Sequence, residues 1–118
     1  MKKIYHLSTC STCQRIIKAL ELGADTVLQD IKTESMTPEQ VDQMANMAGS
    51  YEALFSRRAM KFRSMGLHER ELSEPEYRQL ILDEYTFLKR PVIVVGDQIF
   101  VGNAKKTVEA ASAAMASA

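Results

Sequence analysis

The chain has 118 residues, of which 46% are hydrophobic and 25% charged, and this size and composition fit one globular domain with a sizeable core. Fifteen basic and fifteen acidic residues cancel, so no net field favours nucleic acid or an anionic membrane as a partner. Two cysteines are too few for a secreted disulfide scaffold. No apolar stretch has the length of a signal peptide or a transmembrane helix, and we expect a cytoplasmic protein.

The N-terminal part predicts a strand, a helix and a second strand. A weakly alternating strand is expected over residues 4–7, ending where Ser8 begins a polar turn. Apolar residues at helical spacing follow from Cys13, and Gly23 is the expected stop. Residues 26–31 are partly apolar and β-branched, which favours another strand. This order predicts two parallel strands joined by a right-handed crossover.

The middle of the chain, from about residue 35 to 86, predicts a helical insert. Thr37-Pro38-Glu39-Gln40 combines an N-cap, a proline at the first helical position and a capping-box glutamine. Ser73-Glu74-Pro75-Glu76 caps another helix, and Ser50 caps a short one between them.

The C-terminal part predicts a β-hairpin and a last helix. Val92-Ile93-Val94-Val95 is a continuous apolar run typical of a buried strand, and Gly96-Asp97 turns the chain into Gln98–Val101. Gly102-Asn103 supplies a turn and an N-cap for the final helix. The whole order fits a single α/β domain over residues 1–118, with a four-stranded mixed sheet, flanking helices and the helical insert.

The Cys10-Ser11-Thr12-Cys13 motif follows the first strand, which puts Cys10 in a loop and Cys13 in the first turn of a helix. A thiol reacts as its thiolate, and the unpaired N–H groups and positive end of a helix favour a thiolate there. Cys13 is close enough to attack a sulfur adduct on Cys10 and release it as a disulfide. We therefore predict that Cys10 is the nucleophile of a thiol-redox protein and Cys13 the resolving thiol.

Two other interpretations stay open on these residues alone. The cysteines could be a buried pair with a packing role only, or they could bind zinc. A zinc site needs four ligands, for which the chain offers these two cysteines, His6 and His68 as soft donors. His6, four residues before Cys10, could also hydrogen-bond within the loop or help to keep the thiolate charged, which would make it a supporting residue.

Several segments together resemble the arsenate reductase (ArsC)/Spx-like family of the thioredoxin-fold superfamily, and the match covers nearly the whole chain. The segments are Tyr5-His6 before the cysteine motif, Tyr51 to Arg58, Gly66-Leu67, Phe87 to Ile93, and Val101-Gly102-Asn103. The resemblance implies a thioredoxin-like sheet interrupted by a helical lobe, Cys10 as the nucleophile, and Pro91 in the cis form beside it.

The resemblance also implies a reaction. In arsenate reductases of this family the cysteine attacks arsenate, arginines hold the oxyanion, and glutathione with glutaredoxin completes the reduction. Arg90 falls on the second of the family's three active-site arginines. Ser56 occupies the first position, with Arg57 and Arg58 beside it, and Phe100 to Asn103 contains no arginine to match the third. Membership of the family would therefore not by itself make arsenate the substrate.

Other residues are expected to support substrate binding around the cysteines. We expect Ser11, Thr12, Arg57, Arg58 and Pro91 to bind an oxyanion or a thiol substrate. Arg57 and Arg58 begin a basic run in the insert, which is usually a solvated face. If either turns toward the cysteine loop with Arg90, it would stabilise the thiolate and attract an oxyanion or a glutathione carboxylate.

Lys105 and Lys106 fall in the first turn of the last predicted helix. The helix macrodipole disfavours cations there. They are either solvated surface lysines or the mark of an anion or partner site.

Two functional hypotheses follow. The first is an ArsC-like, thiol-dependent reductase in which Cys13 or glutathione resolves the Cys10 intermediate, and glutathione, glutaredoxin or thioredoxin supplies electrons without any bound cofactor or metal. The second is a Spx-like redox-sensing transcriptional regulator in which the Cys10–Cys13 couple is a switch and the surface contacts RNA polymerase. Neither predicts direct binding to nucleic acid or to a membrane.

Overall fold

The computed structural model describes residues 2–117 and divides into two compact units. The sheet unit combines the N-terminal part of the chain, up to Ser35, with the part from Arg90 onward, and the helical unit spans Met36–Lys89. No helix within residues 2–117 has the length and apolar character needed to span a membrane.

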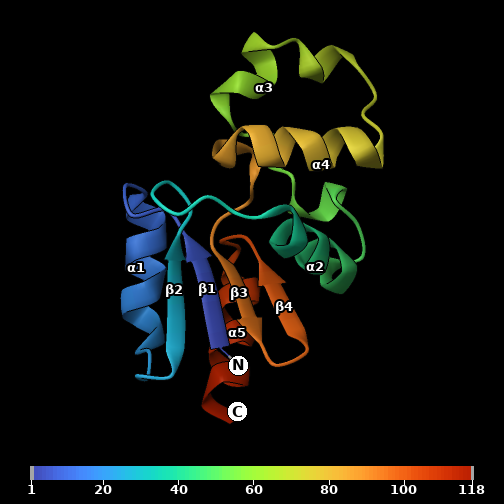
Figure 1. Ribbon diagram of the computed structural model, residues 1–118. Coiled ribbons are helices and arrows are strands. Elements are labelled where there is room, and N and C mark those ends of the chain that lie inside the picture. Colours follow the sequence, from blue (N-terminus) through green and yellow to red (C-terminus); the bar gives the residue numbers. More distant parts are fainter. Residues whose placement is uncertain (1, 118) are drawn as a thin grey trace. The chain divides into compact units, whose positions relative to one another are not determined.

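The sheet unit contains a four-stranded mixed sheet, as predicted (Figure 1). Its elements in chain order are β1 (Lys2–His6), α1 (Ser11–Leu20), β2 (Thr26–Asp30), β3 (Val92–Val95), β4 (Gln98–Val101) and α5 (Lys105–Ser117). The strand order is β2-β1-β3-β4. β1 is parallel to β2 and antiparallel to β3, and β3 is antiparallel to β4. β1 and β3 are therefore the inner strands, and both carry buried residues along their length.

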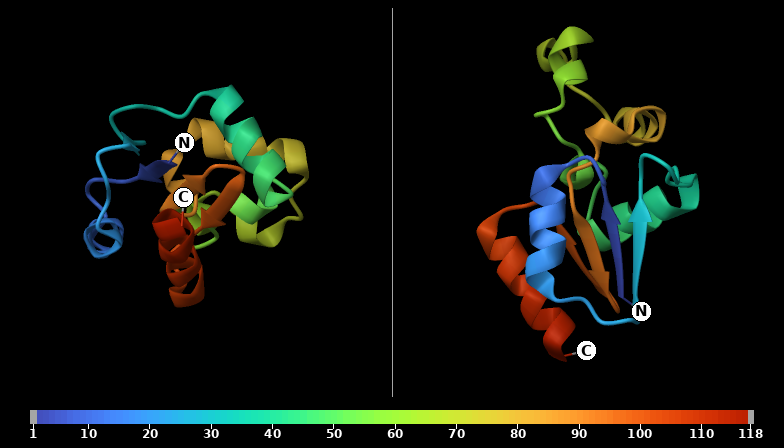
Figure 2. Two further views of the ribbon diagram at one scale, coloured as in Figure 1. Left: turned by 90° about the horizontal axis from the view of Figure 1, so that it is seen from below. Right: turned by 90° about the vertical axis from the view of Figure 1, so that its left-hand side faces the viewer.

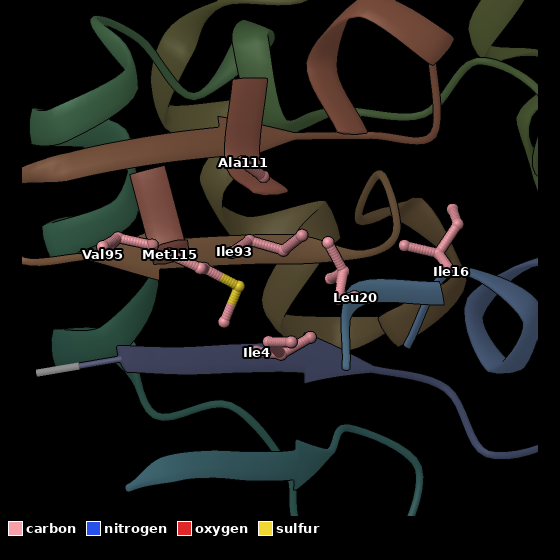
Figure 3. Close-up of a cluster of buried hydrophobic side chains, with 7 residues drawn as sticks. All are labelled: Ile4, Ile16, Leu20, Ile93, Val95, Ala111 and Met115. Atoms are coloured by element: carbon pink, nitrogen blue, oxygen red, sulfur yellow. The ribbon is translucent and has the colours of Figure 1, made fainter. Parts of the chain in front are cut away.

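Helices α1 and α5 cover the same face of this sheet (Figure 2). Their apolar faces meet the sheet in one buried cluster, which consists of Ile4, Ile16, Leu20, Ile93, Val95, Ala111 and Met115 (Figure 3). Burying one large aliphatic side chain stabilises a fold by about 1.5–3 kcal/mol. The cluster therefore fixes where both helices lie on the strands that hold the cysteine loop.

Several predicted boundaries in the sheet unit were wrong. Strand β1 spans Lys2–His6, whereas residues 4–7 were predicted. Helix α1 ends at Leu20 because Glu21 adopts a left-handed conformation with φ of 51°, so Gly23 lies in the following loop and does not stop the helix. Helix α5 begins at Lys105, so Ala104, and not Asn103, precedes its first residue. The Gly102 N–H still donates to the carbonyl of Pro91 at 2.9 Å, which keeps the chain bound to the sheet beyond β4 and delays the helix.

The helical unit contains three α-helices and three single-turn 3₁₀ helices within the described residues. They are α2 (Pro38–Ala48), η1 (Glu52–Leu54), α3 (Met60–Ser64), η2 (Leu67–Glu69), α4 (Glu74–Asp83) and η3 (Tyr85–Phe87). Both predicted capping boxes are present, Thr37 with Gln40 and Ser73 with Glu76. The N-cap residue of η1 is Tyr51 and not Ser50 as predicted, although the Ser50 hydroxyl accepts a hydrogen bond from the Ala53 N–H inside η1 at 3.0 Å. Local sequence signals therefore placed the starts of α2 and α4.

Candidate active site

The edge of the sheet at which β1 ends brings the cysteine motif and Arg90-Pro91 together. Tyr5 pairs with Val92 across the antiparallel strands, and Arg90-Pro91 directly precedes that pair. The Arg90-Pro91 peptide bond is cis, as the family resemblance implied. Cys10 follows β1 by one short turn, and Arg90 is close enough for its charge to act on the Cys10 thiol.

Cys10 is the N-cap residue of α1, with an extended backbone conformation. Its N–H donates to the Leu7 carbonyl at 3.0 Å, and its carbonyl accepts the Gln14 N–H at 3.1 Å. The Gln14 side-chain amide also donates to the Leu7 carbonyl, at 3.4 Å. Cys10 is half-buried, whereas Cys13, in the first turn of α1, is fully buried, and neither forms a disulfide. The loop therefore presents one sulfur to solvent and shields the other.

The pKa of Cys10 lies below its ordinary value. Partial burial acts to raise the pKa, but hydrogen bonds from the Cys13 N–H, the Cys13 thiol and the Thr12 N–H outweigh it, and the positive charge of Arg90 adds to them. These are the N–H groups that a helix leaves unpaired at its start. The site can therefore hold Cys10 as a thiolate.

The pKa of Cys13 is raised to about 11, mainly by burial. Its hydrogen bond to the Cys10 sulfur and the negative charge there raise it further, while the Leu7 backbone and the charge of Arg90 oppose the rise. Cys13 therefore stays a thiol while Cys10 is a thiolate. The two sulfurs share a hydrogen bond and differ in ionisation, which is the arrangement that two successive sulfur attacks need.

Ser11, Thr12 and His6 were also predicted to act at the cysteines. Thr12 supplies a backbone N–H to the Cys10 sulfur, while the Ser11 side chain is exposed. His6 is buried, and its Nδ1 atom has no hydrogen-bond partner among the described residues. His6 is the last residue of β1, close in sequence to Cys10. Its supporting role at the cysteine stays a prediction.

Arg57 and Arg58 belong to the helical unit. The Arg57 guanidinium donates to Glu52 Oε2 at 2.8 Å and to the Tyr77 hydroxyl at 2.9 Å. It also lies over the Tyr77 ring, 5.8 Å from the centroid. Arg58 is exposed and makes no ion pair with any residue from 2 to 117. Of the two, Arg58 is therefore the one whose charge is not already bound.

Asp30 supports the cysteine loop, although it was not among the predicted site residues. Asp30 ends β2, and its carboxylate accepts the Ser8 N–H at 3.3 Å and the Lys32 N–H at 3.2 Å. The pKa of Asp30 lies below its ordinary value. The largest cause is the hydrogen bond from the Ser8 hydroxyl, and the two N–H groups and the charge of His6 lower the pKa further, while desolvation opposes them. A signal was available, because the carboxyl ends of parallel strands meet at one edge of a sheet.

The zinc interpretation lacks a ligand set in the described part of the chain. No three side chains of Cys, His, Asp or Glu among residues 2–117 gather closely enough to hold a metal ion. Structural zinc sites need four such ligands.

The comparisons with known proteins agree with this fold. An arsenate reductase-related protein from Brucella melitensis has a TM-score of 0.72 and 27% identity, over 92% of this chain and 92% of that one. A protein from Staphylococcus aureus COL has a TM-score of 0.75 and 27% identity, over 93% and 97%. An arsenate reductase from Vibrio cholerae, 19% identical with a TM-score of 0.78 over 92% and 95%, is alike in fold.

A search of curated protein sequences gave no significant match. The model of the ArsC family, in contrast, matches residues 5–111, which include the cysteine motif, Arg90 and both units. With its thioredoxin-like fold, the chain belongs to the ArsC family.

Proposed function

We propose that this protein is a thiol-dependent oxidoreductase related to the arsenate reductases, with Cys10 as the nucleophile and Cys13 as the resolving thiol. The observation that carries the proposal is the pair of neighbouring sulfurs with opposite pKa shifts, lowered at Cys10 and raised to about 11 at Cys13. A thiolate beside a protonated thiol is ready for two attacks in a fixed order.

In the first step, the Cys10 thiolate attacks one sulfur of a disulfide substrate. A mixed disulfide forms on Cys10, and the other half of the substrate leaves as a thiolate. The N–H groups of Thr12 and Cys13 and the charge of Arg90 favour the attacking form of Cys10. The exposed part of Cys10 gives the substrate access, since Cys13 is buried.

In the second step, Cys13 attacks the Cys10 sulfur. Once Cys10 is in a disulfide, it carries no charge, and the negative charge that raised the Cys13 pKa is removed. Cys13 can then lose its proton, form the Cys10–Cys13 disulfide and expel the remaining substrate thiolate. The substrate gains two electrons, which the cysteine pair has lost, and glutathione, glutaredoxin or thioredoxin would restore them.

An oxyanion such as arsenate is the second substrate class that we propose to test, because two of the structural neighbours are described as arsenate reductase or related to it. Arg90 would bind the oxyanion beside Cys10. Arg57 and Arg58 belong to the helical unit, and their part in binding the oxyanion stays a prediction. A guanidinium can bind two oxygens at once.

The test compares the wild type with Cys10→Ser and Cys13→Ser, using a symmetrical peptide disulfide in one assay and arsenate with glutathione and glutaredoxin in the other. We expect Cys10→Ser to abolish both reactions. Cys13→Ser should accumulate the Cys10 mixed disulfide with the peptide, visible by mass spectrometry. Undiminished activity in Cys10→Ser would contradict the proposal, whereas disulfide reduction without arsenate reduction would remove only the oxyanion substrate.

The regulator hypothesis uses the same cysteine pair as a switch. We do not carry it further, because no feature of residues 2–117 favours RNA polymerase as a partner.

A further inference from the structure

The first turn of α5 lies at the same edge of the sheet as the cysteine motif. Val92 pairs with Val101, and the Gly102 N–H bonds to the Pro91 carbonyl at 2.9 Å. The last row of paired residues before this edge is Tyr5, Val92 and Val101, and its two outer residues are two strand spacings, about 10 Å, apart. Helices α1 and α5 lie on the same face and both begin at this edge (Figure 2).

Positive charge gathers around this side of the site. Lys105 and Lys106 are exposed, and within residues 2–117 neither makes an ion pair. Arg90 belongs to the same unit, and its charge lowers the pKa of Cys10. In the described structure, neither α1 nor α5 has an acidic residue in its first turn. The side-chain charges therefore add to the positive ends of both helices.

The lysine pair opposes the usual electrostatics of a helix start, which favour acidic residues. The helical unit follows the usual rule, since α2 has Glu39 in its first turn and α4 has Glu74 and Glu76. The exception thus occurs in a helix that begins beside the reactive cysteine. Residues that lower the stability of the helix in which they occur are expected at binding sites.

We propose that Lys105 and Lys106 dock an acidic surface of the protein that exchanges disulfides with Cys10. The inference rests on the proposed function and names the chemistry of its partner. A small oxyanion would need donors that converge within hydrogen-bond distance, whereas these lysines are exposed on a helical turn that follows β4, two strands away from the β1 strand that leads into the cysteine loop. An extended acidic surface can contact both places at once.

The exchange itself follows the two-step scheme in either direction. A reduced partner with two thiols attacks the Cys10 sulfur of the Cys10–Cys13 disulfide and releases Cys13 as a thiolate. Its second thiol then attacks the mixed disulfide and releases Cys10. The partner ends as a disulfide, and the two electrons it has lost are held by Cys10 and Cys13.

The test uses two symmetrical peptide disulfides of equal length, in which the residues around the cysteine are glutamates in one and glutamines in the other. Second-order rate constants for oxidation of the cysteine pair are compared for Lys105→Glu and Lys106→Glu, singly and together. Lys18→Glu is the matched control, because Lys18 is exposed but lies in the last turn of α1, away from the cysteine. Cys10→Ser gives the background rate.

At low ionic strength, we expect the double variant to react about three- to tenfold more slowly with the glutamate peptide, and at an unchanged rate with the glutamine peptide. The difference should fade in high salt. Lys18→Glu should change either rate less than about twofold. The thermal midpoint of the double variant should equal or exceed that of the wild type, because glutamate suits a first helical turn.

Two results would overturn the inference in different ways. The lysines do not dock an acidic partner if the wild type reacts with both peptides at the same rate. The same conclusion follows if Lys18→Glu slows the reaction with the glutamate peptide as much as Lys105→Glu or Lys106→Glu does. If Cys10→Ser reacts with the glutamine peptide as fast as the wild type, the proposed function itself is wrong and this inference falls with it.

Discussion

Cys10 and Cys13 are separated by two residues, yet their environments shift their pKa values in opposite directions. Cys10 stands before the helix, where N–H groups point at its sulfur. Cys13 stands one turn inside, where burial dominates. The division of labour between the two thiols thus follows from a difference of one helical turn.

Arg90→Gln should slow alkylation of Cys10 at neutral pH. Arg90 is the one charged side chain among the causes that lower the Cys10 pKa, so its loss raises that pKa and leaves less thiolate. We expect a decrease of about twofold to tenfold in the iodoacetamide rate constant, measured from pH 5 to 9. Lys89→Gln, one residue earlier and exposed, is the control. A pH profile that is identical in Arg90→Gln and the wild type would contradict the prediction.

Cys13 should make the protein less stable at alkaline pH. Its pKa is about 11 in the folded protein, above the value of about 8.5 of a free cysteine, so folding favours the protonated thiol. The stabilisation is complete below the unfolded value and is lost as pH rises through the folded one. The free energy of unfolding should fall by about 1.4 kcal/mol per pH unit at most in this window.

The check is urea denaturation at several pH values between about 8.5 and 11 for the wild type and Cys13→Ala. The variant removes the titrating group, so its stability should depend less on pH, although its stability at neutral pH is lower because of the cavity. Equal slopes in the two proteins would show that the loss comes from other groups.

At the scale of single elements, Thr37→Ala and Ser73→Ala should each destabilise the protein by about 1 kcal/mol. Each hydroxyl accepts the N–H of the third helical residue, at 3.1 Å for Thr37 and 3.4 Å for Ser73. Chemical denaturation measures the loss. Ser112→Ala, at an exposed position inside α5, is the control and should be neutral or slightly stabilising. Cap variants as stable as this control would show that the boxes contribute nothing.

The elements also differ in how well the sequence could predict them. The capping boxes of α2 and α4 are read from four consecutive residues, so these helix starts were predicted correctly. Helix α3 was not predicted, because it has five residues and none of them is buried. It is held by Phe62, whose ring packs 5.9 Å from that of Phe55 and 6.3 Å from that of His68, and by the ion pair of Lys61 with Glu84. These are contacts with residues outside the helix, so they leave no periodic pattern in its own sequence.

At the scale of the whole molecule, we propose that the two units unfold as one domain, as the length and composition of the chain suggest. Ile81→Val in the helical unit and Ile93→Val in the sheet unit are a matched pair, since both side chains are fully buried. Each should cost about 0.5–1.5 kcal/mol. Circular dichroism would follow the unfolding of the helices of both units, and alkylation of buried Cys13 would follow the unfolding of the sheet unit alone.

Both variants should lower the midpoint of a single transition seen by both probes. If Ile81→Val shifts the circular dichroism transition but leaves the exposure of Cys13 unchanged, the units unfold separately and the one-domain prediction is wrong.

Features of this protein that depend on neighbours along the chain could be predicted from its residues. The Cys10-Ser11-Thr12-Cys13 motif at a strand-to-helix junction, the capping boxes and the order of elements all depend on hydrogen bonds within about four residues and on apolar spacing. Tertiary structure decided which distant residues join that motif. Only the register of β1, β3 and β4 brings Arg90 and the first turn of α5 to the edge where Cys10 lies. Register depends on pairing between strands far apart in sequence, so no local pattern could show that Lys105 and Lys106 begin a helix beside a thiolate.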